Sequence, residues 1–280
     1  MITSSQPATP ASVRPEPIRA DDVLSIDFTG TLSDPTRRHR PDDGHAVARH
    51  ISETHRVQLP VAWADAYTEQ FPTAWRAGRL GALPGLLFRL CQQHGVPMPG
   101  AGRAVSPGDS ARLLAADLIT HFGDHPIPFI HRDVIRRLHA NGRTLVLACT
   151  TSRPHNLRLR TLGEADILDC FAAVVTSSQL GVSKPDTVFF RQVAETVGVD
   201  VSRLVHVGNS LRDDVAGALR AGARAVWVRP GPDAVPDALE PIDLDAVHRL
   251  RAFDDLLTLP GLRNEPRTSL ITSQREGTRP

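Results

Sequence analysis

The stretch that decides the fold reads Asp22-Val23-Leu24-Ser25-Ile26-Asp27-Phe28-Thr29-Gly30-Thr31-Leu32. Its apolar run is typical of a strand buried on both faces, and a glycine-containing turn follows it. Further runs of the same kind occupy 144–149, 172–176, 202–208 and 223–228, and helical stretches separate them, notably 186–197 and 213–221. This alternation predicts an α/β fold with a Rossmann-like, three-layer core around a parallel sheet, and a ligand crevice at the carboxyl ends of the strands.

One segment departs from the alternation. Between the first two strands the spacing of apolar residues is helical, and we expect helices at 46–55, 61–79, 86–94 and 110–122. The residues expected on their apolar faces are Trp63, Trp75, Leu86, Leu87, Leu90, Leu113, Leu114 and Leu118. We therefore expect an all-helical insertion after the first strand that acts as a lid.

The predicted domain limits follow from these patterns. A core of residues 21–36 and 125–262 is interrupted by the helical insertion at 37–124. Residues 1–20 and 263–280 are expected to be a disordered arm and a disordered tail, because both are polar and rich in Pro, Ser or Arg.

Composition excludes several classes of function. The formal net charge of the 280 residues is +1, and basic residues are interspersed with acids, so we expect neither a nucleic-acid nor a membrane partner. Cys91, Cys149 and Cys170 have unrelated spacings, which indicates neither a disulfide framework nor a zinc site. No run spans a bilayer and the start lacks a secretory pattern, so a cytoplasmic location is expected, and the preference for Arg suggests a GC-rich bacterial source.

Polar residues follow the predicted strands at their carboxyl ends. Asp27 follows the first strand, the hydroxyl-rich 149–152 ends the second, and Asp213 and Asp214 follow the fourth. Lys184 is the single lysine among 32 basic residues, which suggests that its position requires a compact point charge. A carboxylate nucleophile, a hydroxyl donor, an ammonium and a second carboxylate suit phosphoryl transfer, with a hard divalent cation bridging carboxylates and phosphate.

Four motifs in this order resemble those of the haloacid dehalogenase (HAD) superfamily: Asp-x-x-Gly-Thr-Leu from Asp27, the hydroxyl-rich strand end, Ser-Lys-Pro around Lys184, and Gly-Asn-Ser-x-x-x-Asp ending at Asp214. The resemblance covers most of residues 22–230, and the helical insertion is similar to the C1-type cap of that superfamily. It implies a Mg²⁺-dependent hydrolase that acts on a small phosphorylated metabolite enclosed under the cap.

The resemblance also implies roles for individual residues. Asp27 would be the nucleophile that forms an aspartyl-phosphate, and Lys184 would neutralise its charge. The implied metal ligands are Asp27, the Thr29 carbonyl, Asn209 and Asp214, with Asp213 able to substitute. The expected phosphate-binding residues are Lys184, Thr150, Thr151, Cys149 and Gly30. The spacing from Gly142 favours Cys149 as the donor of the second motif, whereas the hydroxyl that this motif requires favours Thr150.

Two departures from the family pattern leave alternatives open. Thr29 stands where HAD phosphatases usually carry a second Asp, the general acid and base, and a hydroxyl is a poor proton carrier near neutral pH. Asn209 replaces a common acidic ligand and removes one negative charge from the metal site. The alternatives are therefore an impaired HAD-like protein that binds a phosphate ligand or a protein, and a metal-independent haloacid dehalogenase. The oligomeric state is open. His206 is expected to be a satisfied core histidine, and His155 is a candidate substitute for the missing acid and base.

Overall fold

The computed structural model describes residues 15–34, 42–76, 81–122, 124–228 and 244–263. Within these residues the chain forms a six-stranded sheet in the order β3-β2-β1-β4-β5-β6, and all neighbouring strands are parallel. The strands are β1 (Val23–Ile26), β2 (Thr144–Cys149), β3 (Ala173–Thr176), β4 (Leu204–Gly208), β5 (Arg224–Val228) and β6 (His248–Leu250). The predicted α/β class with a Rossmann-like parallel sheet is confirmed.

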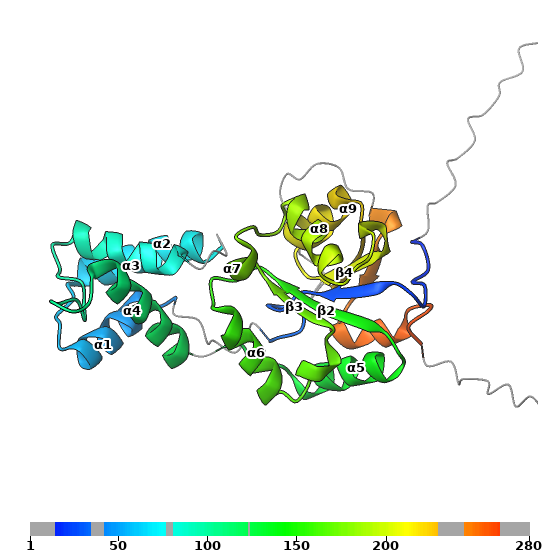
Figure 1. The fold of residues 1–280 in the computed structure, drawn as a ribbon, viewed down its shortest axis with the longest axis horizontal. Helices are drawn as coiled ribbons and strands as arrows, with labels where there is room; N and C mark the ends of the chain where they lie inside the picture. The colour runs from blue at the N-terminus through cyan, green and yellow to red at the C-terminus, as the bar shows by residue number, and fades with distance from the viewer. Residues whose placement is uncertain (1–14, 35–41, 77–80, 123, 229–243, 264–280) are drawn as a thin grey trace, which may run out of the picture.

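Helices cover both faces of the sheet, which makes the three layers visible in Figure 1. Alternate side chains of a strand point to opposite faces. Leu24 and Ile26 of β1 pack in the layer of α5 (Phe129–Ala140) and α6 (His155–Glu164), whereas Val23 packs in the layer of α8 (Thr187–Thr196) and α9 (Gly217–Ala221). The shorter elements are α7 (Ser177–Leu180), η1 (Leu168–Cys170), η2 (Val201–Arg203), η3 (Leu211–Ala216), η4 (Leu244–Ala246) and η5 (Phe253–Thr258).

The segment between β1 and β2 is helical, as predicted. It contains α1 (Gly44–His55), α2 (Val61–Arg76), α3 (Ala82–Gln93) and α4 (Pro107–Phe122), which pack around an apolar cluster of their own and stand to one side of the sheet (Figure 1). Leu113 differs from the prediction, because 63% of it is exposed. Its neighbour Leu114 fills the buried stripe of α4 instead, and the next residue along a helix turns about 100° away from such a stripe.

The structure differs from the expected disordered arm at residues 15–20. Ile18 is buried and packs in the cluster beside α5, and the carbonyl of Pro17 accepts a hydrogen bond from Arg224. The backbone of Ile18 also lies so close to Gly261 that a Cβ on the glycine would be only 1.9 Å from the Ile18 carbonyl oxygen. One apolar side chain therefore anchors this segment. The rest of the expected arm, 1–14, and the expected tail from 264 lie outside the described residues.

Sequence patterns did not indicate β6. It has three residues, of which Leu250 alone is buried, so neither its length nor its apolar content distinguishes it from a loop. In the described ranges, none of the helices is both long and apolar enough to cross a membrane.

Candidate active site

Three charged side chains meet at the carboxyl ends of β1 and β4. Lys184 Nζ lies 2.6 Å from Asp27 Oδ1 and 2.6 Å from Asp214 Oδ1. Asp27 directly follows β1, and its backbone N–H donates to the carbonyl of Val207 in β4 (2.9 Å). All three residues are buried. Because the chain runs from β1 to β2 on one side and β4 lies on the other side, the cluster occupies the switch point at which open parallel sheets bind ligands.

The loop between α7 and α8 brings Lys184 to the cluster. The backbone N–H of Lys184 donates to Thr150 Oγ1 (3.2 Å), and its Nζ also donates to the Ala148 carbonyl (3.3 Å). The ammonium therefore has three oxygen acceptors, which matches its three N–H groups. Such a geometry suits a compact ammonium better than the planar fork of a guanidinium.

Asp214 is held by partners on both carboxylate oxygens. Its Oδ1 lies 3.1 Å from His206 Nε2 in addition to Lys184, and its Oδ2 accepts from the backbone N–H of Ser210 (2.8 Å). The other ring nitrogen of His206 lies 2.9 Å from Ser25 Oγ. The buried histidine is thus satisfied at both nitrogens, as expected, and it orients Asp214.

The two carboxylates differ in acidity although they share one lysine. Burial raises the pKa of Asp27, and the nearby Lys184 only partly offsets this effect. Burial also disfavours the charged form of Asp214, but Lys184 and His206 outweigh it and hold its pKa well below the usual range. For Lys184, burial opposes the charge, yet the two carboxylates outweigh burial and raise its pKa. Burial, assisted by Lys184, lowers the pKa of His206, which is therefore neutral near pH 7.

The turn after β1 lies against Asn209, which directly follows β4. Thr31 Oγ1 donates to Asn209 Oδ1 (3.1 Å). Gly30 has a φ of +82°, and a Cβ there would be 2.7 Å from Asn209 Nδ2, so both the backbone angle and the space require glycine. Thr29 is half-buried in this turn, where it forms a backbone bridge with Ser33.

The expected phosphate-binding residues after β2 have different surroundings. Cys149 is buried in the apolar cluster beside α5 and α6, and burial raises its thiol pKa. The hydroxyl of Thr150 contacts the Lys184 backbone. Thr151 is buried, its backbone N–H donates to Ser177 Oγ (2.8 Å), and its own hydroxyl accepts from the N–H of Arg153. Thr150 is thus adjacent to the cluster, whereas Cys149 and Thr151 contact the surrounding core and loop.

Asp213 and His155 lie outside the charged cluster. The backbone N–H of Asp213 donates to Ser210 Oγ (3.0 Å), which caps η3. His155 begins α6, and its Nδ1 lies 3.4 Å from Thr176 Oγ1 at the end of β3, two strands from Asp27. Burial lowers the pKa of His155.

Sequence reasoning missed Ser25 and Ser177, the partners of His206 and of the Thr151 backbone. A serine in a strand or at the start of a short helix has no distinguishing pattern, because its role depends on a residue more than 20 positions away. It also missed the two buried arginines Arg153 and Arg158, which follow β2.

The oxygen donors of the cluster fit a hard divalent cation. Asp27, Asp214 and Lys184 carry a net charge of −1 in a buried position, and burial, together with the nearby Asp214, raises the pKa of Asp27 despite Lys184. Asn209 adds a carboxamide oxygen beside the Asp27 turn, and Mg²⁺ prefers such oxygen ligands. The part of the chain that the structure describes contains no group of three or more His, Cys, Asp or Glu side chains arranged as a metal site. Amide and carbonyl oxygens would therefore have to complete the ligand set.

The chain is similar in sequence to known hydrolases. The family model described as "haloacid dehalogenase-like hydrolase" matches residues 22–222. A phosphoglycolate phosphatase from Nitrosospira multiformis is 32% identical over 239 residues, which cover 83% of this chain and 92% of that protein. A phosphoserine phosphatase from Thermus thermophilus is 37% identical over 103 residues, which cover 35% of this chain and 41% of that protein. Several such matches span less than half of the relative's length.

Solved structures show the same fold. A 2-haloacid dehalogenase from Pseudomonas syringae pv. Tomato superposes with a TM-score of 0.59 at 23% identity, over 85% of this chain and 96% of that one. The HAD-hydrolase YfnB from Bacillus subtilis superposes with a TM-score of 0.59 at 18% identity, over 87% and 98%. The family match spans both strand ends that carry Asp27 and Asp214, and this chain belongs to the haloacid dehalogenase-like hydrolases.

Proposed function

We propose that this protein hydrolyses a phosphomonoester of a small metabolite, with Mg²⁺ as cofactor and Asp27 as nucleophile. The observation that carries the proposal is the position of Lys184 Nζ, 2.6 Å from Asp27 and from Asp214 in a buried site at the sheet's switch point. The phosphatase names of the Nitrosospira and Thermus relatives support a small phosphorylated substrate. The helical insertion, residues 37–124, would act as the cap, and the core would be residues 21–36 and 125–262.

The chemistry assigned to each residue follows from its contacts. Asp27 forms a bond from a carboxylate oxygen to phosphorus while the bond from phosphorus to the alcohol oxygen breaks. Lys184 reduces the repulsion between this carboxylate and the phosphate oxygens, and Thr150 donates its hydroxyl to one of them. Water then cleaves the aspartyl-phosphate, which releases phosphate and restores Asp27.

Mg²⁺ would be held by Asp27, the Thr29 carbonyl, Asn209 and Asp214, with Asp213 as the neighbouring carboxylate. When bound it would offset the negative charge that the three buried side chains leave uncompensated. Of the other residues expected at the phosphate site, Gly30 shapes the turn beside Asn209, whereas the Thr151 N–H already donates to Ser177 and Cys149 is buried beside α5 and α6.

A second candidate function has an observation of its own. Thr29 occupies the position of the proton carrier, and a threonine hydroxyl is a poor proton carrier near neutral pH. Proton transfer to the leaving alcohol would then depend on solvent, which favours slow turnover and a role in phosphate-ligand binding.

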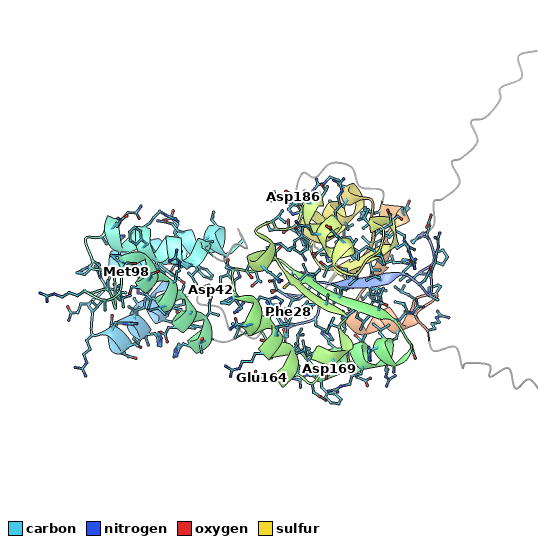
Figure 2. All side chains as sticks on the ribbon, viewed as in Figure 1. Phe28, Asp42, Met98, Glu164, Asp169 and Asp186 are labelled. Carbon is cyan, nitrogen blue, oxygen red and sulfur yellow. The ribbon has the colours of Figure 1, made fainter. Side chains whose placement is uncertain are left out.

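The test is phosphate release from a panel of phosphomonoesters, with and without Mg²⁺, by the wild type, Asp27→Asn and Asp169→Asn. Asp169 is exposed on the lower edge of the core in Figure 2, and its substitution is the matched control. We expect Mg²⁺-dependent turnover that Asp169→Asn retains and Asp27→Asn loses by at least about 10³-fold.

Other outcomes would identify the alternatives. One phosphate per protein molecule in the wild type, with multiple turnover in Thr29→Asp, would establish the binding role. Halide release from a 2-haloacid without Mg²⁺ would establish a dehalogenase, and Mg²⁺-independent phosphate release would contradict the proposed cofactor.

A further inference from the structure

The loop after β2 contacts both the charged cluster and the helical insertion. At its start Thr150 accepts a hydrogen bond from the backbone of Lys184. Two residues later Ser152 Oγ donates to the carbonyl of Trp75 (3.2 Å) near the end of α2. Ser152 is buried, so this contact is shielded from water. Within three residues the loop therefore links the site to the insertion, whose α2 points its C-terminal end at the core in Figure 1.

Arg153 makes the second contact of the loop with the insertion. Its guanidinium lies over the Trp75 ring, 4.7 Å from the ring centroid, and 1% of Arg153 is exposed. Trp75 is the last member of a column of aromatic rings spaced four residues apart along α2. The column comprises Trp63, Tyr67, Phe71 and Trp75, with centroids 5.4, 5.4 and 5.0 Å apart. A desolvated cation above an aromatic face is attracted more strongly than an exposed one.

An ion-pair network continues from Arg153 into the core. Asp124, in the connection that leads from α4 back to the core, lies 3.5 Å from Arg153 Nη1 and 2.7 Å from Arg158 Nη1. Burial opposes the charge on Asp124, but the two arginines outweigh it and lower its pKa. Arg158 in turn lies over the Phe28 ring, 3.4 Å from its centroid, and Phe28 follows Asp27 in the chain. Figure 2 shows Phe28 within the core, on the side of α6.

From these contacts we propose that Arg153 is a positioning residue, which couples the placement of the helical insertion to the loop that supports Thr150 and Lys184. The coupling runs through two buried routes: Ser152 and Arg153 hold the end of α2, and Asp124 holds the returning connection. A shift of α2 relative to the core must break the stack on Trp75 or move the loop beside Lys184. The kinetic part of this inference rests on the proposed phosphatase function, whereas the mechanical part does not.

The contact depends on the shape of arginine. Arg153→Lys keeps the charge beside Asp124 but removes the planar group that stacks on Trp75. Trp75→Leu removes the same stack from the other side and leaves the ion pairs intact. Arg160→Lys is the matched control, because Arg160 lies on α6 and its side chain is 67% exposed, paired with Glu164.

The first measurement is hydrogen exchange on the full chain, with melting curves to confirm that each variant is folded. We expect Arg153→Lys and Trp75→Leu to increase exchange about tenfold both at 72–76 and at 150–154, and Arg160→Lys to change neither segment. Unchanged exchange at 150–154 in both stack variants would overturn the coupling, whether or not any substrate is turned over.

The second measurement is kcat/KM with p-nitrophenyl phosphate and Mg²⁺. The assay is run well below the melting temperature of every variant, so that a less stable variant is still folded. We expect each stack variant to lose about tenfold, and the double variant to lose no more than either single one, since both remove the same contact. A positioning role would be contradicted if the losses of the two single variants added up in the double variant. It would also be contradicted if kcat/KM of the single variants stayed within twofold of the wild type. If the wild type lacks phosphatase activity, the proposed function fails and the exchange experiment alone decides the coupling.

Discussion

Lys184 contacts two carboxylates of unequal acidity, Asp27 and Asp214. Asp214 has partners on both oxygens, including His206 and the Ser210 N–H, so its charge is compensated. Asp27 shares Lys184 and has fewer partners, so burial raises its pKa. Asp27, at the end of β1, is therefore the less compensated of the two carboxylates, which supports its proposed role as the nucleophile.

Replacement of Asp27 tests this imbalance through stability. An unfolded Asp ionises near about pH 3.9, and the raised pKa of folded Asp27 means that the folded state binds more protons above this pH, so its ionisation lowers stability as pH rises. Asp27→Asn cannot ionise. We expect it to have a higher Tm than the wild type at pH 7.5, with the difference vanishing at about pH 3.5.

The measurement is thermal melting across pH, repeated with Mg²⁺. We expect Mg²⁺ to raise the Tm of the wild type and not that of Asp27→Asn, because a cation that binds only the folded state stabilises it. A lower Tm for Asp27→Asn at pH 7.5 would show that Lys184 needs both carboxylates.

At the scale of elements, the turn between β4 and η3 sets the position of Asp214. Gly208 ends β4, and a Cβ there would lie 2.2 Å from Asp214 Cγ. We expect Gly208→Ala to displace Asp214 from Lys184, lower kcat/KM by about 100-fold and cost about 1–3 kcal/mol of stability. Urea unfolding and phosphate release measure the two effects.

Gly163 offers the matched substitution. It lies in α6, and nothing within 4 Å would meet its Cβ. Gly163→Ala should raise stability by about 0.5–1 kcal/mol, because alanine loses less backbone entropy in a helix, and should leave activity unchanged. If Gly208→Ala behaved like Gly163→Ala, the close approach of strand end and carboxylate would not constrain the site.

At the scale of the whole molecule, the two ends of the described chain meet on the core. Ile18 is 3% exposed beside α5, and its backbone packs against Gly261. We expect Ile18→Ala to cost about 2–5 kcal/mol, the usual cost of removing a buried branched side chain, measured by urea unfolding. Leu113→Ala is the control, because Leu113 is exposed and its loss should change stability by less than about 0.5 kcal/mol. Equal small effects would mean that residues 15–20 do not contribute to the core.

The sequence alone determined the fold class, the helical insertion and the residues of the charged cluster. Buried parallel strands are continuous apolar runs, and carboxyl ends of neighbouring strands meet, so Asp27 and Asp214 could be assigned to one site. Lys184 was assigned to the same site because it is the single lysine and lies in the Ser-Lys-Pro motif. These signals are local in the chain, which is why β6, with three residues and one buried side chain, escaped them.

Only the tertiary structure decided which polar residues support that site. Ser25 and His206 are 181 residues apart, and Arg153 meets Trp75 across the junction with the insertion. It also placed Ile18 in the core and turned Cys149 toward the helices rather than toward Lys184. Such outcomes depend on which face of an element packs against a distant one, and burial and hydrogen bonding between distant segments leave no periodic trace in the sequence.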